Sequence, residues 1–162
     1  VLQAFDKISP RLNGKLTFVG QGPMQDVVVD YTKRNSKINF IPYENSRERL
    51  ADLLAASDIY ITAGPHETFA LSVIEAQSCG LPVLGVKAGA LQERVPEHVG
   101  VLVQPNAIDS MAENIYELAT NGFRQKGKNA RKLVKENYTW ENSFIKLFAL
   151  YEKLDSKTFG RL

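Results

Sequence analysis

The chain has 162 residues, of which 44% are hydrophobic and 23% are charged, so it can bury the core of one globular domain. Its longest apolar runs, about five residues, are far shorter than the roughly 20 residues of a membrane-spanning helix, and no secretory signal is visible. The formal net charge of +2 is too small to indicate a nucleic-acid partner. We expect a cytoplasmic location, either free or at the cytoplasmic face of a membrane.

The first part of the chain alternates between helix and strand patterns. Apolar runs predict strands at residues 15–20 and 37–42, of which the first should be buried. Helical spacing predicts a helix end at residues 1–8 and a helix with Met24 on its apolar face. Ser46 can cap a third helix, whose leucines should point inward.

The middle of the chain predicts one strand–helix–strand unit. A β-branched and aromatic run at residues 58–62 indicates a strand, residues 68–79 have helix composition, and residues 82–86 form the next apolar strand. A short helix should lie within residues 87–95, and Gly100–Val103 predicts a last strand.

Two apolar stripes at helical spacing predict helices at about residues 107–155. We expect both stripes to belong to the core, although the aromatic residues of the second could instead form a ligand platform. The first stripe contains Ile108, Met111, Ile115 and Leu118, and the second contains Trp140, Phe144, Leu147, Phe148, Tyr151 and Leu154. Five strands separated by helices predict an α/β fold with a doubly wound parallel sheet, in one domain that covers residues 1–162.

Other chemically active residues give weaker signals. Residues 123–135 are the most basic part of the chain, and they predict either a solvated helix face or a contact with an anionic membrane or partner surface. Cys79, the only cysteine, should pack in the core rather than act as a reactive thiol. His66 adjoins Glu67 and could contact a ligand, whereas a lone histidine such as His98 is more often a hydrogen-bonded or surface residue than a catalytic one. No Cys, His or acid cluster has metal-ligand spacing, so we expect no metal.

Two acids flank the start of the central helix. The N–H groups of a helix start, together with the positive end of its dipole, favour a phosphate. Glu67 lies at that start and Glu75 eight residues on, about 12 Å along a helix, and carboxylates suit sugar hydroxyls. On spacing alone, structural roles are the simpler interpretation: Glu67 as an acid stabilised by the dipole and Glu75 as a surface residue.

A glycine turn joins the first strand to its helix in the string VGQGP, which contains Gly20 and Gly22. Without a third glycine it is a weak dinucleotide-binding motif. A tight turn explains both glycines, and close approach of the backbone to a ligand explains them equally well.

The string ETFALSVIEAQSCGLPV, from Glu67 to Val83, resembles the E-x-x-x-x-x-x-x-E signature of the glycosyl transferases group 1, the retaining glycosyltransferases of family four. The strings VGQGP, LAASDIYITAGPHE, KAGALQERV and GVLVQPNAIDSMAENI are similar to further family segments in the same order. The resemblance covers nearly all of residues 1–154, and it favours functional roles for both acids.

This resemblance implies the C-terminal, donor-binding half of a GT-B enzyme with a Rossmann-like fold. The donor would be a UDP- or GDP-linked sugar, which is a substrate and not a cofactor, and transfer would retain the anomeric configuration without a metal. Glu67 would contact the donor sugar as the catalytic residue and Glu75 would hold the ribose. The other donor-binding residues implied are Gly20, Gly22, Tyr43, His66, Thr68, Phe69, Ala70 and Leu71.

Two departures from the family pattern matter. Ala70 replaces the usual glycine, and its methyl group narrows the room for a phosphate or sugar. The chain begins at Val1, after the family's first strand with its Arg and Lys, so we expect a fragment. We predict that the strands near residues 16–20 and 59–62 pair directly to close the resulting gap, or that a segment is exchanged with a second copy in a homodimer.

We therefore expect the donor domain of a retaining hexosyltransferase, inactive without the N-terminal acceptor domain of a longer protein. Membrane-surface contact of that protein is compatible with the sequence. Because fold does not fix function, a non-catalytic nucleotide-sugar-binding module is an alternative. A nucleotide-sugar epimerase of the same architecture is another, although such epimerases resemble the chain less around Glu67.

Overall fold

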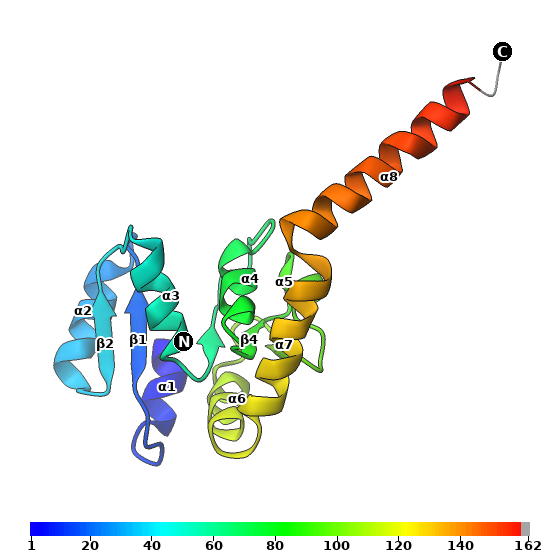
Figure 1. Cartoon of the computed structure of the whole chain (residues 1–162). Helices are drawn as coiled ribbons and strands as arrows, with labels where there is room; N and C mark the ends of the chain where they lie inside the picture. The colour runs from blue at the N-terminus through cyan, green and yellow to red at the C-terminus, as the bar shows by residue number, and fades with distance from the viewer. Residues whose placement is uncertain (160–162) are drawn as a thin grey trace.

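The computed structural model describes the backbone of residues 1–159 and the side chains of residues 1–154. Within these residues, helices alternate with five short strands (Figure 1). In chain order the elements are α1 (Leu2–Ile8), β1 (Leu16–Val19), α2 (Gln25–Arg34), β2 (Ile38–Ile41), α3 (Arg47–Ala55), β3 (Tyr60–Ile61), α4 (Leu71–Ser78), β4 (Val83–Val86), α5 (Leu91–Arg94), β5 (Gly100–Val103), α6 (Ile108–Asn121), α7 (Phe123–Asn137) and α8 (Trp140–Phe159).

All strand pairs are parallel, as the alternating pattern predicts. β1 pairs with β2, so that Leu16 lies opposite Ile38, and β4 pairs with both β3 and β5. Parallel strands need crossover connections, which α2 and α4 supply. Ser46 caps α3 as expected, because its side chain accepts a hydrogen bond from the Arg49 N–H at 3.3 Å. The prediction of an α/β fold with parallel strands is confirmed.

The strands do not form one sheet in the described residues, and our prediction that β1 pairs directly with β3 is wrong. β1 and β2 form one sheet, and β3, β4 and β5 form another (Figure 1). Packing of α1 against α6 sets their separation, since Phe5 and Ile8 of α1 join the same buried cluster as Ile115 of α6. Direct pairing would require β1 to move to about 4.8 Å from β3 and would disrupt this packing.

The core surrounds β4, whose four residues are all buried and which packs against α4 and α6. The sheet of β1 and β2 is less covered. Leu16 and Phe18 are half-buried while Thr17 and Val19 are exposed, so the prediction of a buried first strand is wrong. β1 has a neighbouring strand on one side only, and an alternating burial pattern is what a partly covered strand shows.

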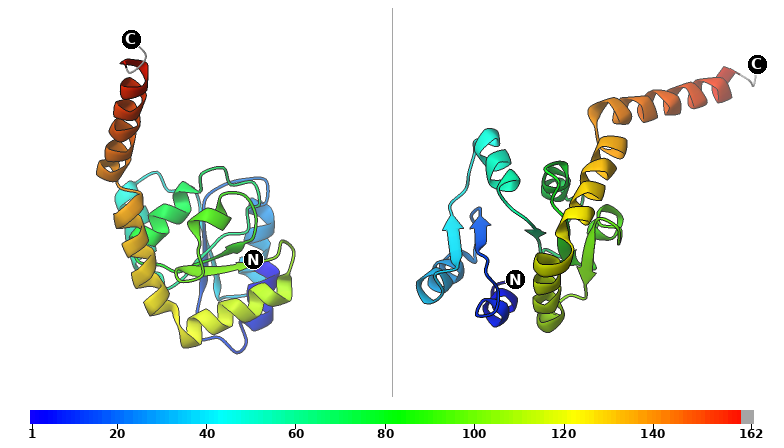
Figure 2. Two further views of the ribbon diagram at one scale, coloured as in Figure 1. Left: turned by 90° about the vertical axis from the view of Figure 1, so that its right-hand side faces the viewer. Right: turned by 60° about the horizontal axis from the view of Figure 1, so that its bottom comes forward.

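The last helix, α8, projects away from the body of the molecule (Figures 1 and 2). Its apolar stripe is therefore exposed, and the prediction that this stripe belongs to the core is wrong. Trp140 is 80% exposed, and the rings of Trp140, Phe144 and Phe148 stack on one another at 5.9 and 6.2 Å. The first stripe is largely in the core as expected, since Met111, Ile115 and Leu118 of α6 are buried.

Candidate functional site

The start of α4 offers free backbone donors. The helix begins at Leu71, three residues later than predicted, because Ala70 takes a left-handed conformation with φ 58° and ψ 51°. The Ala70 carbonyl accepts hydrogen bonds from the N–H groups of Val73 and Ile74 at 3.1 and 3.3 Å. Among the described residues, the N–H groups of Leu71 and Ser72 have no acceptor. These N–H groups and the helix dipole favour an anion at this position.

Glu67 lies in the loop four residues before α4 begins, so the expectation that it lies directly at the helix start is wrong. The side chain is half-buried and lies beside Gly64, where a Cβ would be 3.6 Å from Glu67 Oε1. Gly89 packs directly beneath the loop, and the Ala90 N–H donates to the Glu67 carbonyl at 3.0 Å. The segment before α5 therefore fixes the backbone at Glu67.

Glu75 is exposed on α4, four residues after Leu71. It lies only about 6 Å along the helix axis from the helix start. The roughly 12 Å rise expected between Glu67 and Glu75 assumed a continuous helix, whereas residues 67–70 lie before α4. Its side chain leans back toward the N-terminus, as helical side chains do.

Tyr60, at the start of β3, connects the two acids electrostatically. Burial raises the pKa of Tyr60 above its ordinary value. A hydrogen bond with Ser72 opposes this shift, and the carboxylates of Glu67 and Glu75 both raise the pKa further. The two acids therefore act on the same phenol, beside the open start of α4.

Arg94 of α5 holds the loop before α4 from the side. Its Nε donates to the Phe69 carbonyl at 3.3 Å and its Nη1 donates to Tyr138 Oη at 3.1 Å. Its guanidinium also stacks on the rings of Phe69 and Tyr138, 4.7 and 4.9 Å from their centroids. The side chain is only 13% exposed. Arg94 thus joins the loop at Phe69 to the C-terminal end of α7.

The remaining predicted residues of the loop lie at its surface. His66, Thr68, Phe69 and Leu71 are exposed, whereas Ala70 is buried. Ala70 has a positive φ, a conformation that favours glycine. This agrees with the glycine that the family motif usually has at this position. His98 is exposed as well, and Cys79 is half-buried at the end of α4 and not in the core as expected.

Gly20, Gly22 and Tyr43 follow the carboxyl ends of β1 and β2. Gly20 has φ 133° and so needs to be glycine for its turn, whereas Gly22 has no such requirement. A Cβ on either glycine would meet nothing within 4 Å, and Tyr43 is 64% exposed. Figure 1 shows these loops at the same end of the molecule as the loop before α4. No hydrogen bond or ion pair among the described residues joins the two groups.

Sequence reasoning missed Tyr60 and Arg94 as parts of the site. Tyr60 has a polar hydroxyl on the strand that leads directly to Glu67. Its position before this loop could have identified Tyr60 as a candidate site residue. Arg94 is one of three charged residues in the segment KAGALQERV, and only the folded chain shows its contact with Phe69. Among the described residues, no group of three His, Cys, Asp or Glu side chains could hold a metal ion.

Parallel strands whose carboxyl-end loops lead to an open helix start define a ligand-binding α/β domain of the Rossmann-like class. The chain belongs to the glycosyl transferases group 1, whose family model matches residues 1–140. The resemblance drawn from the sequence is confirmed at the level of this family.

Curated relatives agree with this assignment. The chain is 30% identical over 167 residues to an uncharacterised glycosyltransferase of Methanocaldococcus jannaschii. This match covers 99% of this chain and 42% of the relative. It is 26% identical over 138 residues to a GDP-mannose-dependent alpha-(1-6)-phosphatidylinositol dimannoside mannosyltransferase of Mycobacterium tuberculosis, covering 85% of this chain and 35% of the relative. The chain thus spans about two fifths of the length of these relatives.

Solved structures share the fold. The sucrose-phosphate synthase of Thermosynechococcus elongatus superimposes with a TM-score of 0.75 at 26% identity, over 96% of this chain and 42% of that chain. Like the relatives, the sucrose-phosphate synthase chain extends well beyond the matched part. No helix in the part of our chain that the structure describes is long and apolar enough to cross a membrane.

Proposed function

We propose that this chain is the donor-binding domain of a retaining glycosyltransferase that moves a hexose from a UDP- or GDP-linked sugar to an acceptor. One observation carries the proposal: the N–H groups of Leu71 and Ser72 at the start of α4 have no acceptor among the described residues, and Glu67 and Glu75 lie before and after this helix start. A diphosphate with a sugar on each side has the charge and hydroxyl groups that this arrangement can bind.

In this proposal the diphosphate lies over the start of α4. The backbone from Thr68 to Leu71 donates to its oxygens, and the helix dipole stabilises their charge. When the bond to the hexose breaks, negative charge grows on this leaving group, and fixed N–H donors stabilise it in the transition state. The proposed diphosphate site is built from backbone donors and needs no metal.

The two acids bind opposite ends of the donor. Glu67, half-buried and fixed by Gly89 and Ala90, accepts hydrogen bonds from the hexose hydroxyls. Glu75, exposed one turn into α4, accepts them from the ribose. His66 adjoins Glu67 and faces solvent, so it can contact the hexose as it arrives.

The loops after β1 and β2 form the other side of the proposed site. Gly20 and Gly22 have open space where a side chain would be, so a donor can approach their backbone. The backbone around Ile41 and Tyr43 contacts the base. The GDP-mannose dependence of the mycobacterial relative supports a nucleotide-linked sugar as the donor. Titration with UDP and GDP distinguishes the two candidate bases.

We further propose that the acceptor is bound by an N-terminal domain of a longer protein, in which residues 1–162 are one domain. The support is length, since this chain covers only 42% of the methanocaldococcal relative. The chain alone would then bind donor without transferring sugar. The mycobacterial relative, which is named for a phosphatidylinositol mannoside, supports glycolipid or polysaccharide synthesis as the pathway class.

Calorimetric titration of the full-length protein with UDP, GDP and their sugars, combined with a transfer assay, tests this function. We expect saturable binding of one nucleotide series and transfer with retained anomeric configuration. Binding without transfer to any acceptor would instead support a non-catalytic binding module, and conversion of the donor without an acceptor would support an epimerase. Absence of binding to every nucleotide would refute the proposed site.

A further inference from the structure

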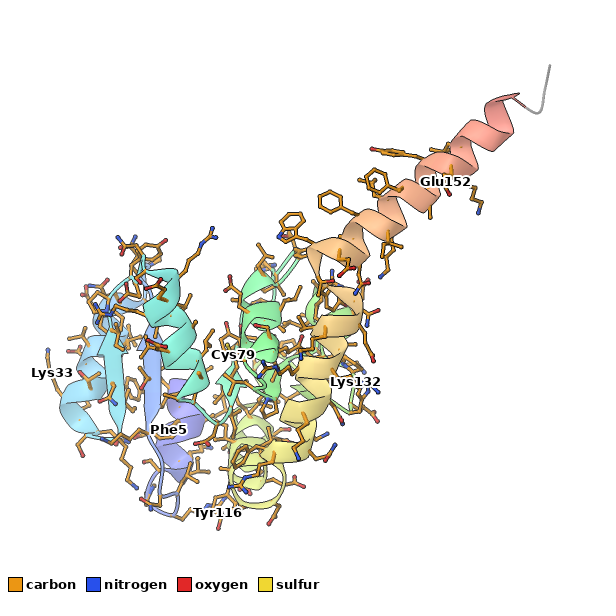
Figure 3. The ribbon with its side chains drawn as sticks, viewed as in Figure 1. Phe5, Lys33, Cys79, Tyr116, Lys132 and Glu152 are labelled. Carbon is orange, nitrogen blue, oxygen red and sulfur yellow. The ribbon has the colours of Figure 1, made fainter. Side chains whose placement is uncertain are left out.

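A groove of about 570 Å³ lies away from the proposed donor site, between α7 and the turn that joins α4 to β4. Its floor is apolar and includes Cys79 and Leu81, whereas α7 contributes basic side chains. Figure 3 labels Cys79 and Lys132 on these two neighbouring elements. The cations that line the groove are Arg124, Lys128, Arg131, Lys132 and Lys135.

Four of these cations form a straight stripe. Arg124, Lys128, Arg131 and Lys135 follow the spacing i, i+4, i+7 and i+11, which places them on one face of a helix. Between the first and the last, α7 rises roughly 16 Å at 1.5 Å per residue. The neighbouring face of α7 is anchored in the protein through buried Gly127, Ala130 and Val134. The stripe therefore belongs to a fixed helix.

The charge of the stripe is not balanced within the described residues. The acids that line the groove are Asp58 and Glu136, and Glu136 forms an ion pair with Lys132 at 3.8 Å. Five cations and two acids leave a local charge of +3. Elsewhere the protein does pair exposed cations with acids, as for Arg11 with Glu113 at 2.6 Å. Uncompensated cations in a concave surface repel one another and attract anions.

The groove is separate from the donor site. Asp58 and Leu81 precede β3 and β4, so the part of the groove that they line lies at the amino ends of these strands, and none of the residues proposed to bind the donor lines the groove. Glu67 and the start of α4 lie beyond the carboxyl end of β3. An anion in the groove would therefore occupy a second site.

We propose that this groove binds a ligand that carries two or more phosphate groups. Lysine and arginine bind phosphate through charge-assisted hydrogen bonds of about 2.7–2.9 Å, and four cations spread along the helix match several phosphates in series better than one. Such phosphates can come from the headgroups of an anionic bilayer or from a soluble polyphosphate. The apolar floor beside the stripe accommodates the non-polar part of a lipid headgroup region.

The test compares a double variant, Lys128→Gln with Arg131→Gln, against a control, Lys15→Gln with Arg34→Gln. Both variants remove two exposed cations, and the control pair lies outside the groove, near β1 and α2. Binding is measured by sedimentation with phosphatidylglycerol vesicles and with phosphatidylcholine vesicles, and by calorimetry with tripolyphosphate. Circular dichroism confirms that each variant keeps its helix content.

We expect the wild type to bind phosphatidylglycerol vesicles or tripolyphosphate, but not phosphatidylcholine, and to lose binding as salt is added. The groove variant should bind roughly 30-fold more weakly, at about fivefold per lost cation, while the control should change little. Loss in the vesicle arm assigns the ligand to lipid, and loss in the tripolyphosphate arm alone assigns it to a soluble phosphate. Wild-type binding to neither, insensitivity to salt, or equal losses in both variants would overturn the proposal.

Discussion

Replacing Gly89 with alanine tests how the loop of Glu67 is held. Gly89 has φ +52°, where an L-residue is strained, and an added Cβ would lie 2.6 Å from the Glu67 carbonyl oxygen and 3.2 Å from that of Pro65. An ordinary contact needs at least 3.4 Å, so the Glu67 carbonyl must retreat by about 0.8 Å (3.4 less 2.6). That movement also stretches the hydrogen bond from the Ala90 N–H.

The expected loss of stability follows from two costs. The left-handed conformation costs alanine about 1–2 kcal/mol, and overpacking against a backbone oxygen costs about 1–3 kcal/mol. We expect Gly89→Ala to lower the free energy of unfolding by about 2–5 kcal/mol. We also expect it to weaken binding of a nucleotide sugar and to affect binding of free nucleotide less, because the displaced residue is Glu67.

Urea denaturation and calorimetric titration measure both effects. Gly122→Ala is the control, since a Cβ there meets nothing within 4 Å and its φ of −173° lies outside the left-handed region that favours glycine. We expect the control to change stability by less than about 0.5 kcal/mol, as surface substitutions usually do. Wild-type stability together with wild-type donor binding in Gly89→Ala would refute the role assigned to this contact.

Three further substitutions test other parts of the account. Gly127→Ala would place a Cβ 2.1 Å from the Gly80 carbonyl oxygen, so overpacking of about 3 kcal/mol should exceed the gain of about 1 kcal/mol in helix propensity; a thermal melt that shows stabilisation would contradict the α4–α7 packing. Arg94→Lys should lower stability by about 1–2 kcal/mol and weaken donor binding, because lysine cannot bridge two rings and two acceptors; unchanged donor binding would show that Arg94 does not position the loop. Ala70→Gly relieves a left-handed strain of about 1–2 kcal/mol at the cost of a buried methyl worth about 0.8 kcal/mol, so its free energy of unfolding should stay near the wild-type value. Ala76→Gly, within the same helix, should lose about 2 kcal/mol, and equal losses in the two would argue against the conformation of Ala70.

The sequence predicted the elements well because their signals are local. Apolar periodicity places β2 near residues 37–42, β5 at Gly100–Val103 and α6 along its stripe of Met111 and Ile115. Each of these segments shows its period within a few residues. The family's order of segments favoured functional roles for Glu67 and Glu75, whereas spacing alone favoured structural ones.

Long-range features were not predictable in the same way. The stripe of α8 shows that the helix has an apolar face, but it carries no information on what covers that face, and Trp140 is exposed. Packing of α1 against α6 joins residues about a hundred positions apart, as in the ion pair between Arg11 and Glu113, and it keeps β1 away from β3. The start of α4 was misplaced because a left-handed alanine at position 70 has no signature in composition.

The central claim is that one donor spans Glu67 and Glu75 across the start of α4. Calorimetric titration of Glu67→Ala and Glu75→Ala in the full-length protein, with the free nucleoside diphosphate and with its sugar-linked form, tests it most directly. The account predicts that Glu75→Ala weakens binding of the free nucleotide, while Glu67→Ala leaves that binding near the wild-type value and weakens the sugar-linked donor. Equal loss of free-nucleotide binding in both variants would contradict it.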